Sequence, residues 1–196
     1  MKKVERNELL GLAEYEQIRP QFRARIIGEK KERRVLVSDE ISAVFENRDT
    51  VLFQIQEMLR TERITKEAAI LHEIETYNDL VPGEAELSAT MFVEIADAAT
   101  RERRLVELAG LEGKIALEVL GTKIAGRNET RGVLPDRTTA VHYVKFPLGR
   151  ELAARLVARA KNLESTMFFL LEHPMLGVRK EIPAATVQNL VGDFAD

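Results

Sequence analysis

The residues best suited to chemistry lie in one predicted helix, from Glu46 to Arg60. Carboxylate, amide and guanidinium groups recur along it at spacings of three and four residues, which places them on one side of an α-helix. Phe53 lies among them, and phenylalanine and arginine are residue types that anchor protein interfaces. Carboxylate–arginine clusters can also perform acid–base chemistry or hold anionic substrates. The candidate interaction or ligand residues are Glu46, Arg48, Asp49, Phe53, Gln56, Glu57, Arg60 and Tyr77.

This helix has two predicted contact faces. One is apolar and is made of Val51, Leu52, Ile55, Met58 and Leu59. The other, here called the polar stripe, is made of Asp49, Phe53, Gln56 and Arg60 and lies nearly opposite. Asn47 is a good N-cap and Asp49 complements the helix dipole, so structural roles alone can also explain the polar cluster. Arg48 falls on the apolar side, and its guanidinium must therefore reach water or pair with a carboxylate, such as the nearby Glu46 or Asp49.

Two functional hypotheses follow and both stay open. In the first, the chain is a non-enzymatic accessory protein whose polar stripe docks on a protein partner or on a second copy. In the second, it is an enzyme or a binder of a small anionic ligand. The cleft would then lie between the helical first third and a sheet, with Tyr77 and the charged residues of Glu46–Arg60 lining it.

A metal site is a weaker alternative. His72, Glu75 and Asp79 project from one face of a predicted helix, but this face lies opposite an apolar stripe and is expected to face solvent. With no cysteine, the chain cannot form a disulfide, a thiolate zinc site or a cysteine-bound iron–sulfur cluster. His142 lies in a predicted strand and is expected to be packed and hydrogen-bonded, not catalytic. We therefore assign no metal and no cofactor.

The composition is that of a soluble protein with a sizeable core. The chain has 196 residues, of which 45% are hydrophobic and 31% charged, and we expect one domain over residues 1–196. Its net charge of −3 makes nucleic-acid binding unlikely, and its apolar runs are too short to span a membrane. Charged residues stand where a secretory signal would be apolar, which indicates a cytoplasmic protein.

The first third, residues 1–82, is predicted to be mainly helical with one hairpin. Asn7 is expected to cap a helix over Glu8–Ile18, which Pro20 ends or follows with a new first turn. The hairpin strands are Arg33–Val37 and Ile41–Phe45. The helix of residues 46–60 follows, then a helix over Lys66–Leu80, and Pro82-Gly83 is the strongest break in the chain.

Residues 84–196 are predicted to contain two similar β-α-β-β units, offset by 51 residues over the first strand and helix. The first has strand Ala89–Ile95, helix Asp97–Ala109, strand Lys114–Leu120 and strand Thr122–Ala125. The second has strand Ala140–Phe146, helix Gly149–Ala160, strand Thr166–Glu172 and strand Leu176–Ile182; a short helix near Ala184–Phe194 ends the chain. Such units can form an antiparallel, ferredoxin-like sheet with its helices on one face. The predicted fold class is α+β.

Three segments resemble a known bacterial family. They are EYEQIRPQFRARII (Glu14–Ile27), FENRDTVLFQIQEMLRTERI (Phe45–Ile64) and ETYNDLVPGEAELSAT (Glu75–Thr90), and they are similar to the domain-of-unknown-function family 3501. The family has no established activity and no catalytic residues to assign. Its genes often lie beside those of a rubrerythrin and an iron–sulfur oxidoreductase. The resemblance therefore implies a partner in peroxide defence or electron transfer, while a homodimer is a separate expectation from open sheet edges.

Overall fold

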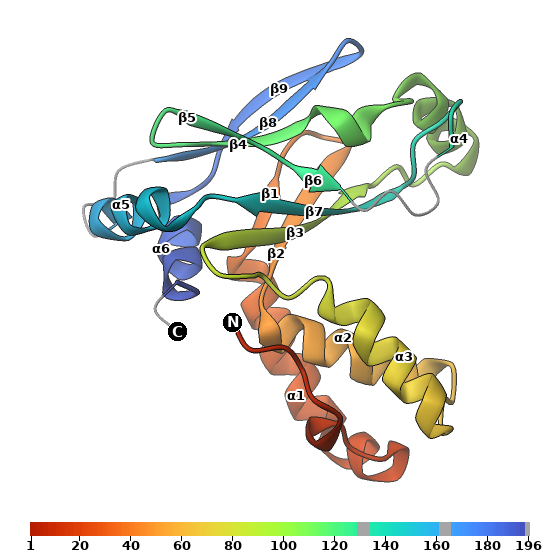
Figure 1. Cartoon of the computed structure of the whole chain (residues 1–196). Coiled ribbons are helices and arrows are strands. Elements are labelled where there is room, and N and C mark those ends of the chain that lie inside the picture. Colours follow the sequence, from red (N-terminus) through yellow and green to blue (C-terminus); the bar gives the residue numbers. More distant parts are fainter. Residues whose placement is uncertain (129–133, 161–165, 195–196) are drawn as a thin grey trace.

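A computed structural model describes residues 1–128, 134–160 and 166–194 (Figure 1). The first third contains η1 (Arg6–Glu8), α1 (Leu12–Glu32), β1 (Arg34–Leu36), β2 (Ile41–Glu46), α2 (Arg48–Thr61) and α3 (Glu67–Asn78). Next along the chain are β3 (Glu86–Val93), α4 (Ala98–Glu107), η2 (Leu111–Lys114), β4 (Ile115–Val119), β5 (Thr122–Ala125) and β6 (Arg127–Asn128). The last elements are β7 (Val141–Pro147), α5 (Arg150–Ala160), β8 (Met167–His173), β9 (Leu176–Glu181) and α6 (Ala184–Gly192).

The helices and strands predicted from the sequence are present. The predicted bounds of the first helix, however, are wrong. The helix expected over Glu8–Ile18 instead begins at Leu12 and continues through Pro20 to Glu32. Proline removes one main-chain donor and leaves the carbonyl four residues earlier, that of Glu16, without it. Because Pro20 and Glu16 are both exposed, water can satisfy that carbonyl, and the helix continues.

The strands form two antiparallel sheets. Sheet A has the order β1-β2-β3-β7-β6 and sheet B the order β5-β4-β8-β9. The two expected β-α-β-β units are present in chain order, as β3-α4-β4-β5 and β7-α5-β8-β9. Each unit places its first strand in sheet A and its hairpin in sheet B, so the single ferredoxin-like sheet is not what forms.

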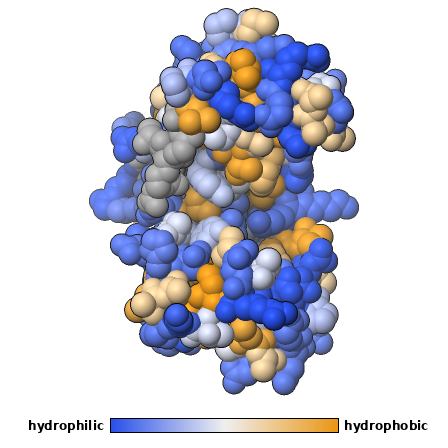
Figure 2. Space-filling view, turned by 90° about the vertical axis from the view of Figure 1, so that its right-hand side faces the viewer, coloured by the Kyte–Doolittle hydropathy of each residue, from blue (hydrophilic) through white to orange (hydrophobic). Residues whose placement is uncertain are grey.

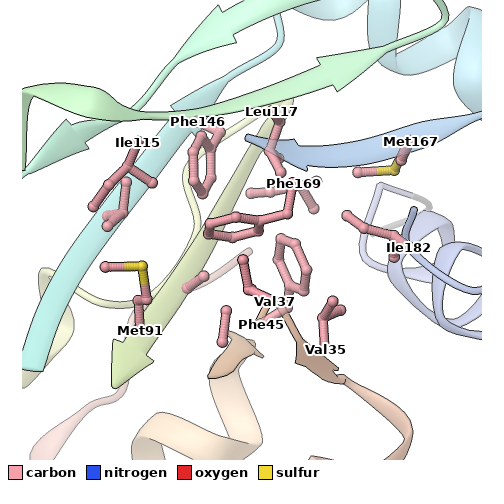
Figure 3. Close-up of a cluster of buried hydrophobic side chains, with 14 of the residues drawn as sticks. Val35, Val37, Phe45, Met91, Ile115, Leu117, Phe146, Met167, Phe169 and Ile182 are labelled. Atoms are coloured by element: carbon pink, nitrogen blue, oxygen red, sulfur yellow. The ribbon is translucent and has the colours of Figure 1, made fainter. Parts of the chain in front are cut away.

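The core explains this difference. The inner faces of the two sheets pack on each other, with Phe146 of sheet A and Phe169 of sheet B edge to face at 6.1 Å (Figure 3). A single sheet would need its helices to cover this apolar surface, yet α4 is highly charged and buries only Leu105. The two sheets cover each other and so remove this apolar surface from water, and Leu105 of α4, Leu152 and Leu156 of α5 and Val187 and Leu190 of α6 pack around the same core.

A second apolar cluster holds the helical layer together. Residues of the N-terminal segment, α2, α3 and the segment after α3 form it, and Tyr143 on the outward face of sheet A packs against it. The layer of α1, α2 and α3 therefore lies on the outer side of sheet A, away from sheet B (Figure 1). In the described ranges, no helix has the length and apolar character needed to cross a bilayer.

Candidate functional site

Glu57 is the centre of a polar contact between α1 and α2. Its two carboxylate oxygens accept hydrogen bonds from Arg19 at 2.8 and 2.9 Å. One of these oxygens also accepts from the hydroxyl of Tyr15 at 2.7 Å and lies 3.4 Å from Nε of Arg60. The hydrogen bonds of Arg19 lower the pKa of Glu57 to about 2, with smaller help from Tyr15 and Arg60. The Glu57 carboxylate is therefore ionised and fully engaged within the chain.

The polar stripe also contacts neighbouring parts of the same chain. Asp49 pairs with Arg25 of α1 at 2.6 Å, and the ring of Phe53 meets Phe22 of α1 edge to face at 5.5 Å. Gln56 is buried, and its amide makes two 3.0 Å hydrogen bonds to the main chain of Leu10. The polar stripe thus holds α1 and the N-terminal segment on α2, and its contact with a partner stays a prediction.

Arg48 pairs with a carboxylate, as its position on the apolar side of the helix requires. That carboxylate is far from Arg48 in the sequence. Its guanidinium hydrogen-bonds to both carboxylate oxygens of Glu8 in η1, and not to Glu46 or Asp49. The main-chain hydrogen bond from Glu5 and this arginine lower the pKa of Glu8. The expected pairing within the helix was wrong because the N-terminal segment folds back onto α2.

Glu46 is buried under the start of α2, on the outward face of sheet A. Its carboxylate accepts hydrogen bonds from Thr50 of α2 and from Thr90 of β3, and Lys30 lies 3.9 Å away. The helix N-terminus above it favours a negative charge. Asn47 caps this helix by accepting a 2.9 Å hydrogen bond from the amide of Thr50, which confirms its predicted role.

Tyr77 lies on α3, near Tyr143 of sheet A. Burial raises its pKa, and the neighbouring Tyr143 adds to the effect. The eight candidate residues are therefore not brought into one cleft. Asp49, Phe53, Glu57 and Arg60 face α1, Gln56 and Arg48 bond to the N-terminal segment, and Glu46 and Tyr77 lie toward sheet A.

The weak metal candidates line a groove of about 610 Å³ beside the N-terminal segment. His72, Glu75 and Asp79 share it with Lys3 and apolar side chains of α3. Within the residues that the structure describes, no three His, Asp or Glu side chains are placed so that they could hold a metal ion.

An apolar row on the outward face of sheet A was missed from the sequence. Leu36 of β1, Phe92 of β3 and Val141 of β7 form this row, in register with the buried Ser42 of β2, whose hydroxyl bonds to the ion pair of Arg34 and Glu94. Leu36 is 59% exposed and Val141 38% exposed, while Phe92 is half-buried. Figure 2 faces this end of the sheet and shows apolar side chains in a hollow between two hydrophilic lobes. The available signal was the alternation in each strand, which places these apolar residues on the outward face.

A second missed cluster lies at one end of the sandwich. Thr138 donates a hydrogen bond to the carboxylate of Glu112, and its oxygen lies 3.3 Å from Nε2 of His142. Thr138 and His142 are both buried, and burial lowers the pKa of the imidazole. The expectation that His142 is packed and hydrogen-bonded is confirmed. Its partners were not predictable locally, because Glu112 is 30 positions away in the sequence.

Comparison with known proteins agrees with the resemblance seen in the sequence. The family model "Protein of unknown function (DUF3501)" matches residues 3–194. A crystal structure of a novel protein of unknown function from Burkholderia pseudomallei K96243 is similar, with a TM-score of 0.88 and 29% sequence identity. The alignment covers 98% of this chain and 99% of that one. No curated protein matches the sequence.

Proposed function

We propose a function for this chain, which belongs to the DUF3501 family of proteins of unknown function. The proposed function is that of a cytoplasmic, non-enzymatic accessory protein that docks on a partner protein. The observation that carries it is the apolar row of Leu36, Phe92 and Val141 on the outward face of sheet A. Exposed apolar groups gathered on one face are typical of interaction sites.

The state of the charged residues supports an accessory role over acid–base catalysis. Glu57, with a pKa of about 2, cannot take up a proton near neutral pH, where a general acid or base must exchange one. The arginines around it are engaged as well: Arg19 by Glu57, and Arg60 by Glu57 and by Glu16 at 3.6 Å. An anionic ligand would have to break these ion pairs to bind there.

The expected partner is a protein of a peroxide-defence or electron-transfer system. This expectation rests on the family's association with a rubrerythrin and an iron–sulfur oxidoreductase. The chain has no cysteine with which to bind an iron–sulfur cluster, so the redox centre would belong to the partner. The apolar row would then position that partner, and its aromatic member, Phe92, is of the type that anchors interfaces.

The test uses a matched pair of surface substitutions in the full chain. Val141→Asp places a charge in the apolar row, whereas Met175→Asp places one at a 57% exposed position in the β8–β9 turn. Each tagged protein is expressed in its own host, the co-purifying proteins are identified by mass spectrometry, and binding of the purified rubrerythrin and oxidoreductase is measured by calorimetry. We expect a partner to bind the wild type and Met175→Asp and to be lost with Val141→Asp.

Two outcomes would contradict the proposal. Equal binding by Val141→Asp would remove the apolar row from the interface, and Asp49→Ala/Arg60→Ala would then test the polar stripe. No partner with any protein, together with calorimetric binding of a small anion, would favour the ligand-binding alternative. Sedimentation of the same proteins measures whether the expected homodimer forms.

A further inference from the structure

We propose that Glu112, Thr138 and His142 form a pH-sensitive latch that closes one end of the β-sandwich at neutral pH and releases it on acidification. The three residues come from η2, from the segment before β7 and from β7 itself. They are separate from the polar stripe and from the apolar row. The latch is independent of the proposed docking function.

The hydrogen bonds of the cluster make Nε2 of His142 a donor when the latch is closed. The hydroxyl proton of Thr138 is directed to Glu112, so the same oxygen can only accept from His142. A ring that carries a proton on Nε2 makes this bond in the neutral and in the charged form, so burial of the ring decides between the two forms. The hydroxyl separates the imidazole from the carboxylate, and His142 therefore has no direct ion pair that would stabilise a charged ring in the buried site.

Burial decides the direction of the pH effect. His142 is 4% exposed and Thr138 1% exposed, so a charged imidazole loses its hydration in the closed state. This desolvation lowers the pKa of His142 below its ordinary 6.5, although Glu112 and the main chain of Thr139 both favour the charged form. In an open state, the ring regains water and an ordinary pKa, so protons bind the open state more tightly.

The surroundings of His142 offer little compensation for that charge. Met91 of β3 lies directly across from His142 in the sheet. The nearby Arg137 is paired with Glu102 of α4 at 2.6 Å. β6 contributes the uncharged Asn128, whose amide donates to the carbonyl of Glu112 and so ties β6 to the same η2. Glu112 is thus the charged group that bears on the imidazole, and its carboxylate is already engaged by Thr138.

The latch joins η2, the segment before β7 and α4. Besides its side-chain bonds, Thr138 donates its amide to the carbonyl of Leu105 just before the end of α4, at 2.9 Å. Release of Thr138 therefore loosens η2, β6 and the segment 134–140 together. The opposite end of sheet B, where the amide of Ile182 bonds to Met167 at 3.0 Å, is not linked to this cluster and serves as an internal reference.

Amide hydrogen exchange tests the latch on the full chain. Protection factors, corrected for the intrinsic pH dependence of exchange, are measured for Thr138 and Ile182 between pH 7.5 and 5. In the wild type, we expect protection of Thr138 to fall by up to about tenfold per pH unit below 6.5, and Ile182 to stay constant. His142→Gln should remove the pH dependence, whereas His72→Gln, which alters an exposed histidine of α3, should keep it.

Titration of the imidazole by NMR provides a second measurement that needs no variant. A His142 pKa below 6.5 together with the Thr138 effect supports the latch. The proposal is overturned if His142 titrates at 6.5 or above, if Ile182 loses protection in parallel, or if His142→Gln keeps the wild-type pH dependence. Should His142→Gln fail to fold, the imidazole titration and the two wild-type protection profiles decide the question.

Discussion

The hydroxyl of Tyr15 and the carboxylate of Glu57 are joined by a 2.7 Å hydrogen bond in the contact between α1 and α2. Tyr15 is fully buried, so its hydroxyl has no access to water as an alternative partner. We predict that Tyr15→Phe lowers the free energy of unfolding by about 1.5–3 kcal/mol, the range for losing a hydrogen bond to a charged group. Urea denaturation measures this. A variant as stable as the wild type would show that Arg19 alone holds Glu57 in place.

The same carboxylate should contribute a pH-dependent part of the stability. Because the pKa of Glu57 is about 2 when folded and its ordinary value is 4.5, its ionised form stabilises the folded state above pH 4.5. That contribution is lost as the pH falls from 4.5 toward 2. We therefore expect the difference in unfolding free energy between the wild type and Glu57→Gln to be largest above pH 4.5 and to shrink below it. A difference that is constant with pH would contradict this prediction.

Arg33 should matter more for stability than any exposed arginine. It is 1% exposed, donates to the carbonyls of Phe45 and Glu46, and pairs with Asp193 beyond the end of α6. Arg33→Met would leave these acceptors and a carboxylate without the guanidinium, and we expect a loss of about 3–5 kcal/mol.

The matched control for Arg33 is Arg150→Met. Arg150 pairs with Glu84 at 2.8 Å, but both side chains are mostly exposed to water. Water therefore replaces the lost partner, and we expect thermal unfolding of this variant to be nearly unchanged. Equal destabilisation by the two substitutions would show that burial of the Arg33 pair is not what determines its effect.

Local patterns were sufficient to predict the elements but not their partners. The strand predicted over Ala140–Phe146 is present as β7, in which buried residues alternate with more exposed ones. In β2, by contrast, every residue is buried. Ile41, Ala43 and Phe45 belong to the core between the sheets, while Ser42 and Glu46 on the other face bond to Glu94 and to Thr50 of α2. Whether the hairpins join sheet A or form a second sheet depends on contacts between distant segments, which leave no periodic signal in the chain.

The candidate site shows the same division. The polar stripe was predicted to contact a partner or a second copy, and the structure places α1 against its members Asp49, Phe53 and Arg60. The long course of α1 was missed because Pro20 is a general helix breaker, and its exposure is known only in the fold. Pairs such as Arg48 with Glu8 join residues 40 positions apart, so sequence spacing could not identify them.

Gly126 should tolerate no side chain, for a reason that its neighbours make explicit. A Cβ there would lie 2.5 Å from Val144, 2.9 Å from the carbonyl oxygen of Ile115 and 3.1 Å from Phe146. We predict that Gly126→Ala destabilises the protein by about 1–3 kcal/mol, as overpacking in a core does.

Gly28 in α1 provides the opposite case, and it is the control for Gly126. A Cβ at Gly28 meets no atom within 4 Å, and the residue is in the interior of a helix. Gly28→Ala should therefore stabilise the protein by about 0.5–1 kcal/mol, because alanine has a higher helix propensity than glycine and lowers the conformational entropy of the unfolded chain. Thermal unfolding of both variants measures whether each is more or less stable than the wild type. Destabilisation by Gly28→Ala would contradict the open surroundings of that site.

Substitution of Phe53 tests whether this ring of the polar stripe packs within the chain or docks on a partner. Its ring meets Phe22 edge to face at 5.5 Å, and such pairs couple by about 0.5–1.5 kcal/mol in double-mutant cycles. We predict coupling of that size when unfolding is measured for Phe22→Leu, Phe53→Leu and the double variant. If stability is unaffected by Phe53→Leu while binding of the partner is lost, the ring belongs to the interface. Coupling between the two rings with binding intact would instead mean that α1 occupies the surface that the sequence suggested for a partner.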